Sequence, residues 1–361
     1  MAKKRLFLWI GSAFVVCLVY LFVAPKPILP ELTLNIQWIL DLSQPVPDQA
    51  QNPDTAGEGI PFVLGTQFGY ISANGHLLAN RSLQKNQMVS ITPSLLSIYT
   101  TNPDSVTITN QQNKKEILIN NPGGYPLLFG DSSFIIGKDQ DSISAIKDDG
   151  SVQWKYFFPS PITAIDYKAK KLLIGTLDGS IYVLGPEGDT LFTFQPGGSR
   201  LSVIVGAALS SDGNKIALIS GIDKQRFILL EKSSQTYKVL DHYFLNSDFR
   251  RPVLIKFIQD NQYILFEGEN SFFAFDSVKQ KMHVISLEAP LIAIEELTKD
   301  QVLFILAGGD TKKQLIVFKL PDRKLVTSSF TARDSFLVPV DNQILLGSDT
   351  VIVSLSMPKQ D

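Results

Sequence analysis

Short apolar runs alternate with compact polar turns along most of this chain, and their spacing predicts β-strands. The clearest example is KLLIGTLDGSIYVL at 171–184, where two strands flank Asp178 and Gly179. Glycine adopts positive φ without a steric penalty, so this Asp-Gly pair predicts a tight hairpin turn. Further strands are expected at 162–167 and 190–194, which places four strands in a row.

The same hairpin recurs through the chain. Each copy has an apolar strand, a turn containing Gly, Asp, Asn or Ser, and a second strand. The copies span 61–72, 94–109, 134–146, 171–184, 215–230, 263–275, 302–318 and 343–355. Their period of about 40 residues is typical of a β-propeller with four short strands per blade. A β-sandwich also has many short strands, but not one hairpin repeated at one period.

An internal match between two distant strands predicts how the ring closes. The triplets IQW at 36–38 and VQW at 152–154 are each followed by a proline at the same spacing. The second triplet lies on an outer strand, whereas the strand at 33–40 has no inner strands before it. The last unit, 336–354, ends without an outer strand. We therefore predict an all-β fold, an eight-bladed β-propeller of four-stranded blades that is closed by its N-terminal strand.

The N-terminus has a different pattern, because residues 6–24 carry no charge and are mostly apolar. A helix of this length matches the ~30 Å hydrocarbon layer of a bilayer. The cations at 3–5 predict a cytoplasmic N-terminus, and three prolines within 25–30 predict an extended spacer. The expected order is a cytoplasmic tail 1–5, one transmembrane helix 6–24, a Pro-rich spacer 25–32, the propeller 33–356 and a C-terminal tail 357–361.

A cleaved signal peptide is the alternative for this segment. Such a peptide has a shorter apolar core and a small-x-small cleavage site. Here Phe22 is bulky at the position three residues before the candidate cut, and Pro25 follows it. We expect a retained anchor in the cell (inner) membrane, single-pass, with the propeller on the extracytoplasmic, periplasmic side.

Composition excludes several functional classes. The formal charge of −2, with 19% charged residues, does not favour a nucleic-acid partner, which would require a basic face. One cysteine rules out a disulfide framework, and the three histidines are far apart in the sequence. Asp139 and Asp141 have the first spacing of a calcium loop, but Ile143 and Ser144 break the pattern. We therefore expect no metal and no cofactor.

The repeats resemble a known family. SIYVLGPEGDTLFTF and ISAIKDDGSVQWKYF are similar to the quinoprotein-like (pyrroloquinoline-quinone-type) propeller repeat, and SSDGNKIALIS resembles WD40-like repeats. Among its members, the BamB outer-membrane assembly scaffold is similar in size and blade count. The resemblance implies an eight-bladed propeller but no single function. Enzymes of this family resemble one another in a calcium-binding carboxylate set, a Trp over the cofactor and often a Cys pair. Here the only cysteine, Cys17, lies in the expected anchor, and Trp38 and Trp154 are expected to fill gaps between blades.

A connection between two blades is the candidate contact surface. It is rich in aromatic and basic side chains, which are enriched at interface hot spots. The candidate partner contacts are Tyr243, Phe244, Phe249, Arg250 and Arg251. A polar, Pro-rich insertion at 43–59 is expected to be disordered.

Two functions from different classes remain open. We expect a non-catalytic scaffold, not an enzyme, that binds envelope proteins and is held at the membrane by its N-terminal helix. The alternative is a redox enzyme that binds a quinone or another small ligand in the axial channel.

Overall fold

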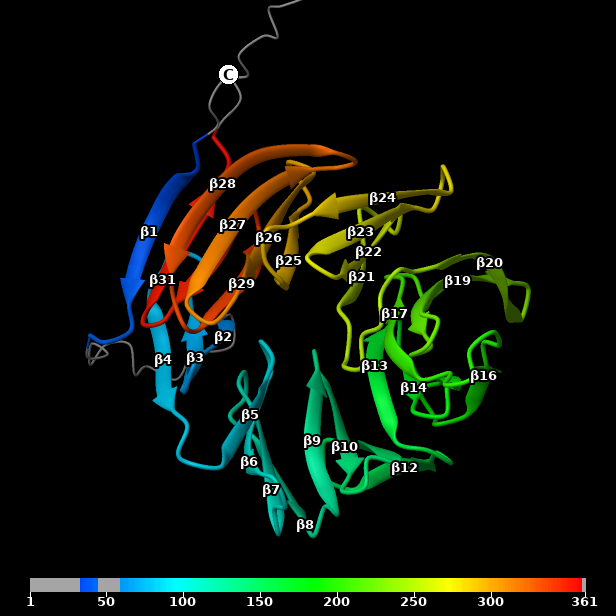
Figure 1. Ribbon diagram of the computed structural model, residues 1–361. Helices are drawn as coiled ribbons and strands as arrows, with labels where there is room; N and C mark the ends of the chain where they lie inside the picture. Colours follow the sequence, from blue (N-terminus) through cyan, green and yellow to red (C-terminus); the bar gives the residue numbers. More distant parts are fainter. Residues whose placement is uncertain (1–32, 45–58, 359–361) are drawn as a thin grey trace, which may run out of the picture. The chain divides into compact units, whose positions relative to one another are not determined.

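The computed structural model describes residues 33–44 and 59–358, and every regular element in them is a β-strand (Figure 1). The chain divides into two compact units, Met1–Thr33 and Leu34–Asp361. The predicted transmembrane helix at 6–24 and its flanking segments lie outside the described residues. Within the described ranges, no helix has the length and apolar character needed to cross a membrane.

The strands form eight consecutive antiparallel sheets, which we number as blades 1 to 8. Blades 1 to 4 consist of β2 (Ile60–Leu64), β3 (Gln67–Ile71) and β4 (Leu77–Ser82); β5 (Gln87–Ile91), β6 (Leu95–Thr100), β7 (Ser105–Asn110) and β8 (Glu116–Asn120); β9 (Gly124–Phe129), β10 (Ser132–Gly137), β11 (Ser142–Ile146) and β12 (Val152–Phe157); and β13 (Ile162–Lys168), β14 (Lys171–Thr176), β15 (Ile181–Leu184) and β16 (Thr190–Phe194).

Blades 5 to 8 consist of β17 (Ile204–Leu209), β18 (Lys215–Ser220), β19 (Arg226–Ser233) and β20 (Thr236–Phe244); β21 (Ile255–Ile258), β22 (Tyr263–Gly268), β23 (Ser271–Asp276) and β24 (Lys281–Ser286); β25 (Leu291–Leu297), β26 (Val302–Gly308), β27 (Lys312–Lys319) and β28 (Arg323–Thr331); and β29 (Ser335–Val340), β30 (Gln343–Ser348), β31 (Val351–Ser356) and β1 (Asn35–Asp41).

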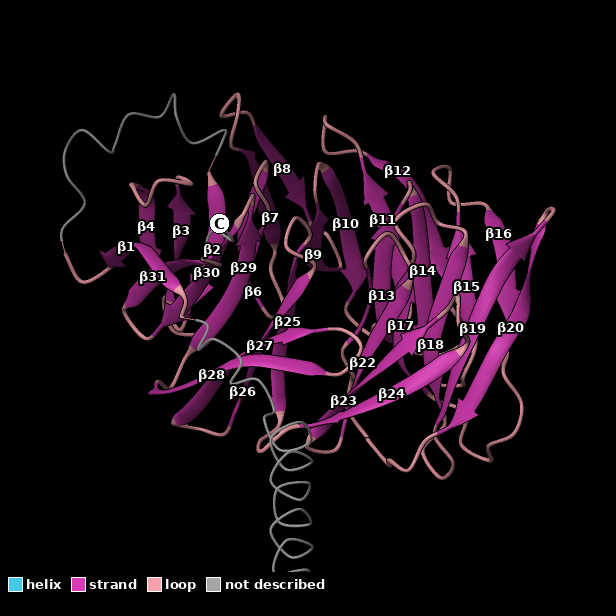
Figure 2. Cartoon of the chain, turned by 90° about the horizontal axis from the view of Figure 1, so that it is seen from above, coloured by secondary structure: helices cyan, strands magenta, loops and turns pink. Residues whose placement is uncertain are grey.

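The first strand of each four-stranded blade lies nearest the ring axis and the last lies at the rim (Figure 1). Figure 2 shows the strands joined only by loops. All eight predicted hairpins are present, and in blades 2 to 8 they are the second and third strands. The eight-bladed propeller predicted from the repeats is therefore confirmed.

The N-terminal strand closes the ring as predicted. Strand β1 pairs antiparallel with β31, from Asn35 opposite Ser356 to Asp41 opposite Val351. The last blade therefore combines strands from the two ends of the propeller. This pairing covers the backbone edge of β31, which would otherwise be open to pairing with another chain.

Blade 1 departs from the four-strand prediction, because it has only three strands among the described residues. Its β3–β4 turn contacts Trp38 of blade 8, just as the β15–β16 turn of blade 4 contacts Trp154 of blade 3. By this equivalence β2, β3 and β4 are the second, third and outer strands. The residues before β2, 45–58, lie outside the described part, and they include most of the polar insertion.

Apolar side chains pack between neighbouring blades, because each sheet buries both of its faces. Seven clusters of buried hydrophobic residues each join two adjacent blades, from the blade 2–3 pair around the ring to the blade 8–1 pair. None of these clusters, which cover only described residues, joins blades 1 and 2. At that interface the hydroxyl of buried Tyr70 donates to the carbonyl of Thr92 at 2.9 Å.

The two tryptophans of the matched triplets link blades, as the sequence predicts. Trp38 donates through Nε1 to the carbonyl of Ala73 at 3.1 Å, and Trp154 donates to the carbonyl of Pro186 at 2.7 Å. Each indole packs against a glycine in the same turn. At Gly188, φ is +79° and a Cβ atom would lie 2.6 Å from the Trp154 ring. Only glycine fits this position without displacing the indole.

Candidate functional site

The predicted contact surface lies where the chain crosses from blade 5 to blade 6. The chain leaves the rim at Phe244, the end of β20, and reaches the inner strand β21 at Ile255. This connection lies on the same face of the ring as the turns between second and third strands. We call this face the connection face.

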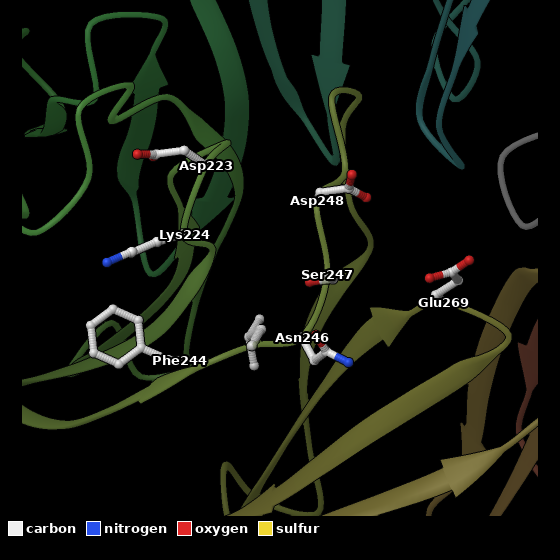
Figure 3. Close-up of a pocket in the computed structure, with 8 residues that line it drawn as sticks. Asp223, Lys224, Phe244, Asn246, Ser247, Asp248 and Glu269 are labelled. Carbon is white, nitrogen blue, oxygen red and sulfur yellow. The ribbon is translucent and has the colours of Figure 1, made fainter.

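Exposure alternates from residue to residue along 241–250. The side chains of His242, Phe244, Asn246, Asp248 and Arg250 are exposed, and each residue between them is half-buried. An alternation with period two is the geometry of an extended chain, in which successive side chains point to opposite sides. This geometry holds for β20 up to Phe244, whereas the chain bends at Asn246 and residues 247–250 cross the connection face in a new direction (Figure 3).

The fully buried side chain of Gln225 holds this segment in place. The backbone carbonyl of Gln225 accepts the N–H of Leu245 at 2.8 Å, and the side-chain Oε1 accepts the Ser247 hydroxyl at 2.8 Å. Its Nε2 donates to the carbonyl of Phe249 at 2.6 Å. A buried amide that satisfies its hydrogen bonds in this way selects one conformation for the segment that it contacts.

An ion pair fixes the far end of the connection. The Arg251 guanidinium donates two hydrogen bonds to the Glu267 carboxylate, at 3.0 and 2.6 Å. The Glu267 side chain is only 5% exposed, whereas that of Arg251 is 53% exposed. The hydrogen bond that Arg251 donates to Glu267 raises the pKa of Arg251. Arg251 also lies over the Phe249 ring, 4.8 Å from its centroid. Removal of Arg251 would leave a buried carboxylate without its partner.

The five predicted contact residues lie together but have different surroundings. Tyr243 and Phe249 pack against the apolar cluster between blades 5 and 6. The Tyr243 hydroxyl donates to the Asp241 carboxylate at 3.1 Å. Phe244 is 61% exposed, and Arg250 is exposed. The accessible residues are therefore Phe244, Arg250 and the outer part of Arg251. The other two, Tyr243 and Phe249, pack against the apolar cluster.

A hollow of about 660 Å³ opens beside this connection (Figure 3). Its lining comes from the β18–β19 turn, the end of β20, the connection and the β22–β23 turn. The residues are Asp223, Lys224, Phe244, Leu245, Asn246, Ser247, Asp248 and Glu269. Sequence reasoning missed Asp223, Lys224 and Glu269. The hairpin repeat could have indicated these three residues. They lie in the turns between the second and third strands of blades 5 and 6, and such turns lie on the same face as the connection between the two blades.

The hollow has more negative than positive groups. Three carboxylates, those of Asp223, Asp248 and Glu269, line it together with one cation, Lys224. Asp223 accepts hydrogen bonds from the Ser199 hydroxyl and, at 3.4 Å, from the backbone N–H of Arg200. The Ser199 bond is the main cause that lowers the pKa of Asp223. This carboxyl therefore stays ionised at neutral pH.

Phe244 forms the apolar end of the hollow. The Arg226 guanidinium lies over its ring, 5.7 Å from the centroid, and Arg226 also donates to the carbonyl of Gly197. His242 approaches the same ring edge-on, with centroids 6.3 Å apart. These contacts orient the ring but leave most of it accessible to a partner.

Two further hollows lie elsewhere on the ring. One of about 380 Å³ lies between blades 3 and 4 on the face opposite the connection face, and its aromatic walls include Phe134, Trp154 and Tyr167. Another of about 520 Å³ lies on the connection face, around Arg333, where blades 7, 8 and 1 meet. Within residues 33–44 and 59–358, no three His, Cys, Asp or Glu side chains gather in a metal-binding arrangement.

Comparisons with known proteins agree with this fold. A family model described as "beta-propeller protein" matches residues 1–360. A protein of Treponema pallidum (strain Nichols), described as uncharacterized, is 24% identical over 361 residues, which cover 98% of this chain and 94% of that protein.

Two solved structures have the same architecture. BamB from Moraxella catarrhalis has a TM-score of 0.62 at 13% identity, over 90% of this chain and 100% of that chain. The computationally designed Ika8 protein also has a TM-score of 0.62 at 13% identity, over 88% of this chain and 99% of that chain. At these identities the likeness shows the fold alone.

Proposed function

This chain belongs to the beta-propeller protein family, and we propose that it acts as a non-catalytic protein-interaction scaffold. In this proposal the segment 6–24 anchors the chain in the cell membrane, and the propeller binds envelope proteins on the extracytoplasmic side. The specific form of the proposal is a BamB-like role in envelope protein assembly.

The observation that carries the proposal is the ordered surface between blades 5 and 6. Exposed loops usually lose conformational entropy when they bind, which weakens the complex. Here Gln225 and the Arg251–Glu267 pair already hold the connection in one conformation. The segment presents an exposed aromatic ring and an exposed arginine, the side-chain types that contribute most at protein interfaces. An ordered surface of this kind supports protein binding.

Site-specific photo-crosslinking in native membranes tests the proposal. We would place a photoreactive phenylalanine analogue at Phe244 and, in a second variant, at Arg250. A third variant would carry it at Gln112, which is exposed in the β7–β8 turn on the opposite face. We expect the first two positions to crosslink to the same envelope protein and Gln112 not to do so. Equal capture at all three positions, or none at any, would count against a scaffold.

Charge reversal at Arg250 provides a second readout. Arg250→Glu should reduce the yield of the Phe244 crosslink without changing thermal stability, because Arg250 is exposed and forms no ion pair or cation–π contact among the described residues. Arg251→Glu is less suitable, because it would unpair the buried Glu267. A rise in melting temperature with a quinone and Ca²⁺ would instead favour the redox alternative, because a ligand selective for the native state stabilises it.

A further inference from the structure

The hollow between blades 3 and 4 is lined by a row of side chains that crosses blade 3. In the strand register Phe134 lies opposite Ala145, and Ala145 lies opposite Trp154, so these three side chains share one face of the sheet. All three line the hollow of about 380 Å³ on the face opposite the connection face. The small alanine between two aromatic rings leaves space, and the volume is within the range of small-molecule sites, ~300–1,000 Å³.

The matching row of blade 4 shows that this space is not general to the fold. There Leu173 lies opposite Val183, and Val183 lies opposite Phe192. Val183 is fully buried, and Tyr237 of blade 5 packs on Phe192 with ring centroids 5.0 Å apart. The middle of this row therefore holds a larger side chain than Ala145. The hollow depends on the particular residues of blades 3 and 4.

The walls of the hollow combine aromatic surface with one free donor. Trp154 already donates its indole N–H to the carbonyl of Pro186 at 2.7 Å, so its ring offers only apolar contact. The Tyr167 ring packs edge-on against Phe134, with centroids 5.4 Å apart. Its hydroxyl accepts a hydrogen bond from Ser132 at 3.3 Å, and it donates none within the described residues. The Tyr167 proton is therefore available to a ligand.

The rim of the hollow carries two charges of each sign. The four residues, all exposed, are Asp131, Lys147, Asp148 and Lys170. No ion pair among the described residues engages any of them. An anionic ligand would meet two carboxylates, and a cationic ligand would meet two ammonium groups. A quinone has only acceptor oxygens and could not pair with the carboxylates. A neutral ligand with hydroxyl groups suits both, because a hydroxyl donates to a carboxylate and accepts from an ammonium group.

We propose that this hollow binds a neutral saccharide. The apolar C–H face of a pyranose ring lies against Trp154 and Tyr167. The hydroxyl groups of the sugar bond with Asp131, Lys170 and the Tyr167 hydroxyl. This inference goes beyond the proposed scaffold function and does not depend on it, because the surface between blades 5 and 6 lies on the other face of the ring.

A glycan microarray tests the proposal, with the full-length protein in a detergent that has no sugar headgroup. The array would carry neutral, acidic and amino-sugar oligosaccharides. We expect the protein to bind neutral glycans, because the rim charges balance. Absence of binding to every glycan, or binding to charged glycans alone, would overturn the inference.

Isothermal titration calorimetry with the tightest-binding soluble saccharide from the array locates the site. Tyr167→Phe keeps the ring but removes the donor, and it should weaken binding by about 5-fold, which corresponds to about 1 kcal/mol for one hydrogen bond. Asp131→Ala should also weaken binding. Asp139→Ala is the matched control, because Asp139 is an exposed aspartate of the same blade on the connection face. It should bind like the unchanged protein.

Ala145→Val tests the space itself, because it gives blade 3 the residue that blade 4 has in the matching row. It should abolish binding, and its melting temperature shows whether the propeller still folds. Asp131→Ala changes only an exposed side chain, so its effect on binding is measurable even if Ala145→Val does not fold. Affinity that neither Tyr167→Phe nor Asp131→Ala changes would overturn the inference.

Discussion

At the residue scale, the glycines beneath the two tryptophans show how the blades are joined. We predict that Gly188→Ala destabilises the propeller more than Gly123→Ala does. Both glycines have positive φ, +79° and +66°, so alanine is strained by about 1–2 kcal/mol at either position. Only at Gly188 would the new Cβ also collide with Trp154, whereas nothing lies within 4 Å at Gly123. Urea unfolding of the two variants measures the difference.

Removal of the indole provides the control for that prediction. In a Trp154→Ala background the extra cost of Gly188→Ala should disappear, because the colliding ring is gone. Equal losses for both glycine variants in the unchanged protein would show that the indole moves aside freely. The sequence predicted the outer-strand positions of both tryptophans from the repeated triplet. It did not predict their glycine partners, because each lies in the turn of the next blade.

A half-buried carboxyl predicts a pH dependence. Burial raises the pKa of Asp166, although its carboxylate accepts the backbone N–H of Leu209 at 2.7 Å. A carboxyl with a raised folded-state pKa contributes most to stability below its unfolded pKa, and this contribution is lost as pH rises through the folded value. We therefore expect Asp166→Asn to gain stability over the unchanged protein as pH rises from about 4 to 7. Urea unfolding across this pH range measures the difference in the free energy of unfolding between the two proteins.

Asp248→Asn is the matched control, because Asp248 is exposed to solvent. Its stability difference from the unchanged protein should vary little with pH. If Asp166→Asn became less stable as pH rose, the ionised carboxylate would be stabilising the blade 4–5 interface, contrary to this prediction.

At the scale of elements, strand β1 is expected to be essential for cooperative folding. Deletion of residues 31–42 removes strand β1, which pairs with the outer edge of β31, and the link from Trp38 to blade 1. We expect the single unfolding transition to broaden or to shift to much lower temperature, as followed by circular dichroism. Ile39→Thr is the control, because Ile39 is 63% exposed on the same strand and its loss should have little effect. An unchanged melt after deletion would show that β1 does not stabilise the ring.

The elements also show why parts of the structure could not be predicted. The hairpins could be predicted from the sequence because most second and third strands are buried on both faces and so have an apolar run in the sequence. Blade 1 has three strands among the described residues instead of the predicted four. The sequence ahead of β2 is polar and contains no apolar run. The candidate site was found only in part, because Asp223 and Glu269 lie in turns whose composition is ordinary. Their role depends on the ring, which brings the turns of adjacent blades to one connection.

At the scale of the whole molecule, charge predicts the side of the membrane on which the propeller lies. Lys3, Lys4 and Arg5 precede the uncharged segment, and the rest of the chain carries 30 basic and 35 acidic residues, a balance of −5. Basic residues beside a span stay in the cytoplasm, so the propeller should be exported. We predict that a cysteine at Ser328, which is exposed on β28, is labelled in intact spheroplasts by a membrane-impermeant maleimide. The variant would carry Cys17→Ser, so that Ser328→Cys supplies its only thiol.

The orientation decides which partners can reach the connection face at all, so this result limits every binding experiment. A cytoplasmic protein with an exposed cysteine should be labelled only after lysis, which confirms that the spheroplasts are intact. Labelling of Ser328→Cys only after lysis would place the propeller in the cytoplasm. The surface between blades 5 and 6 would then face cytoplasmic proteins, and an envelope partner would be excluded even if that surface binds a protein.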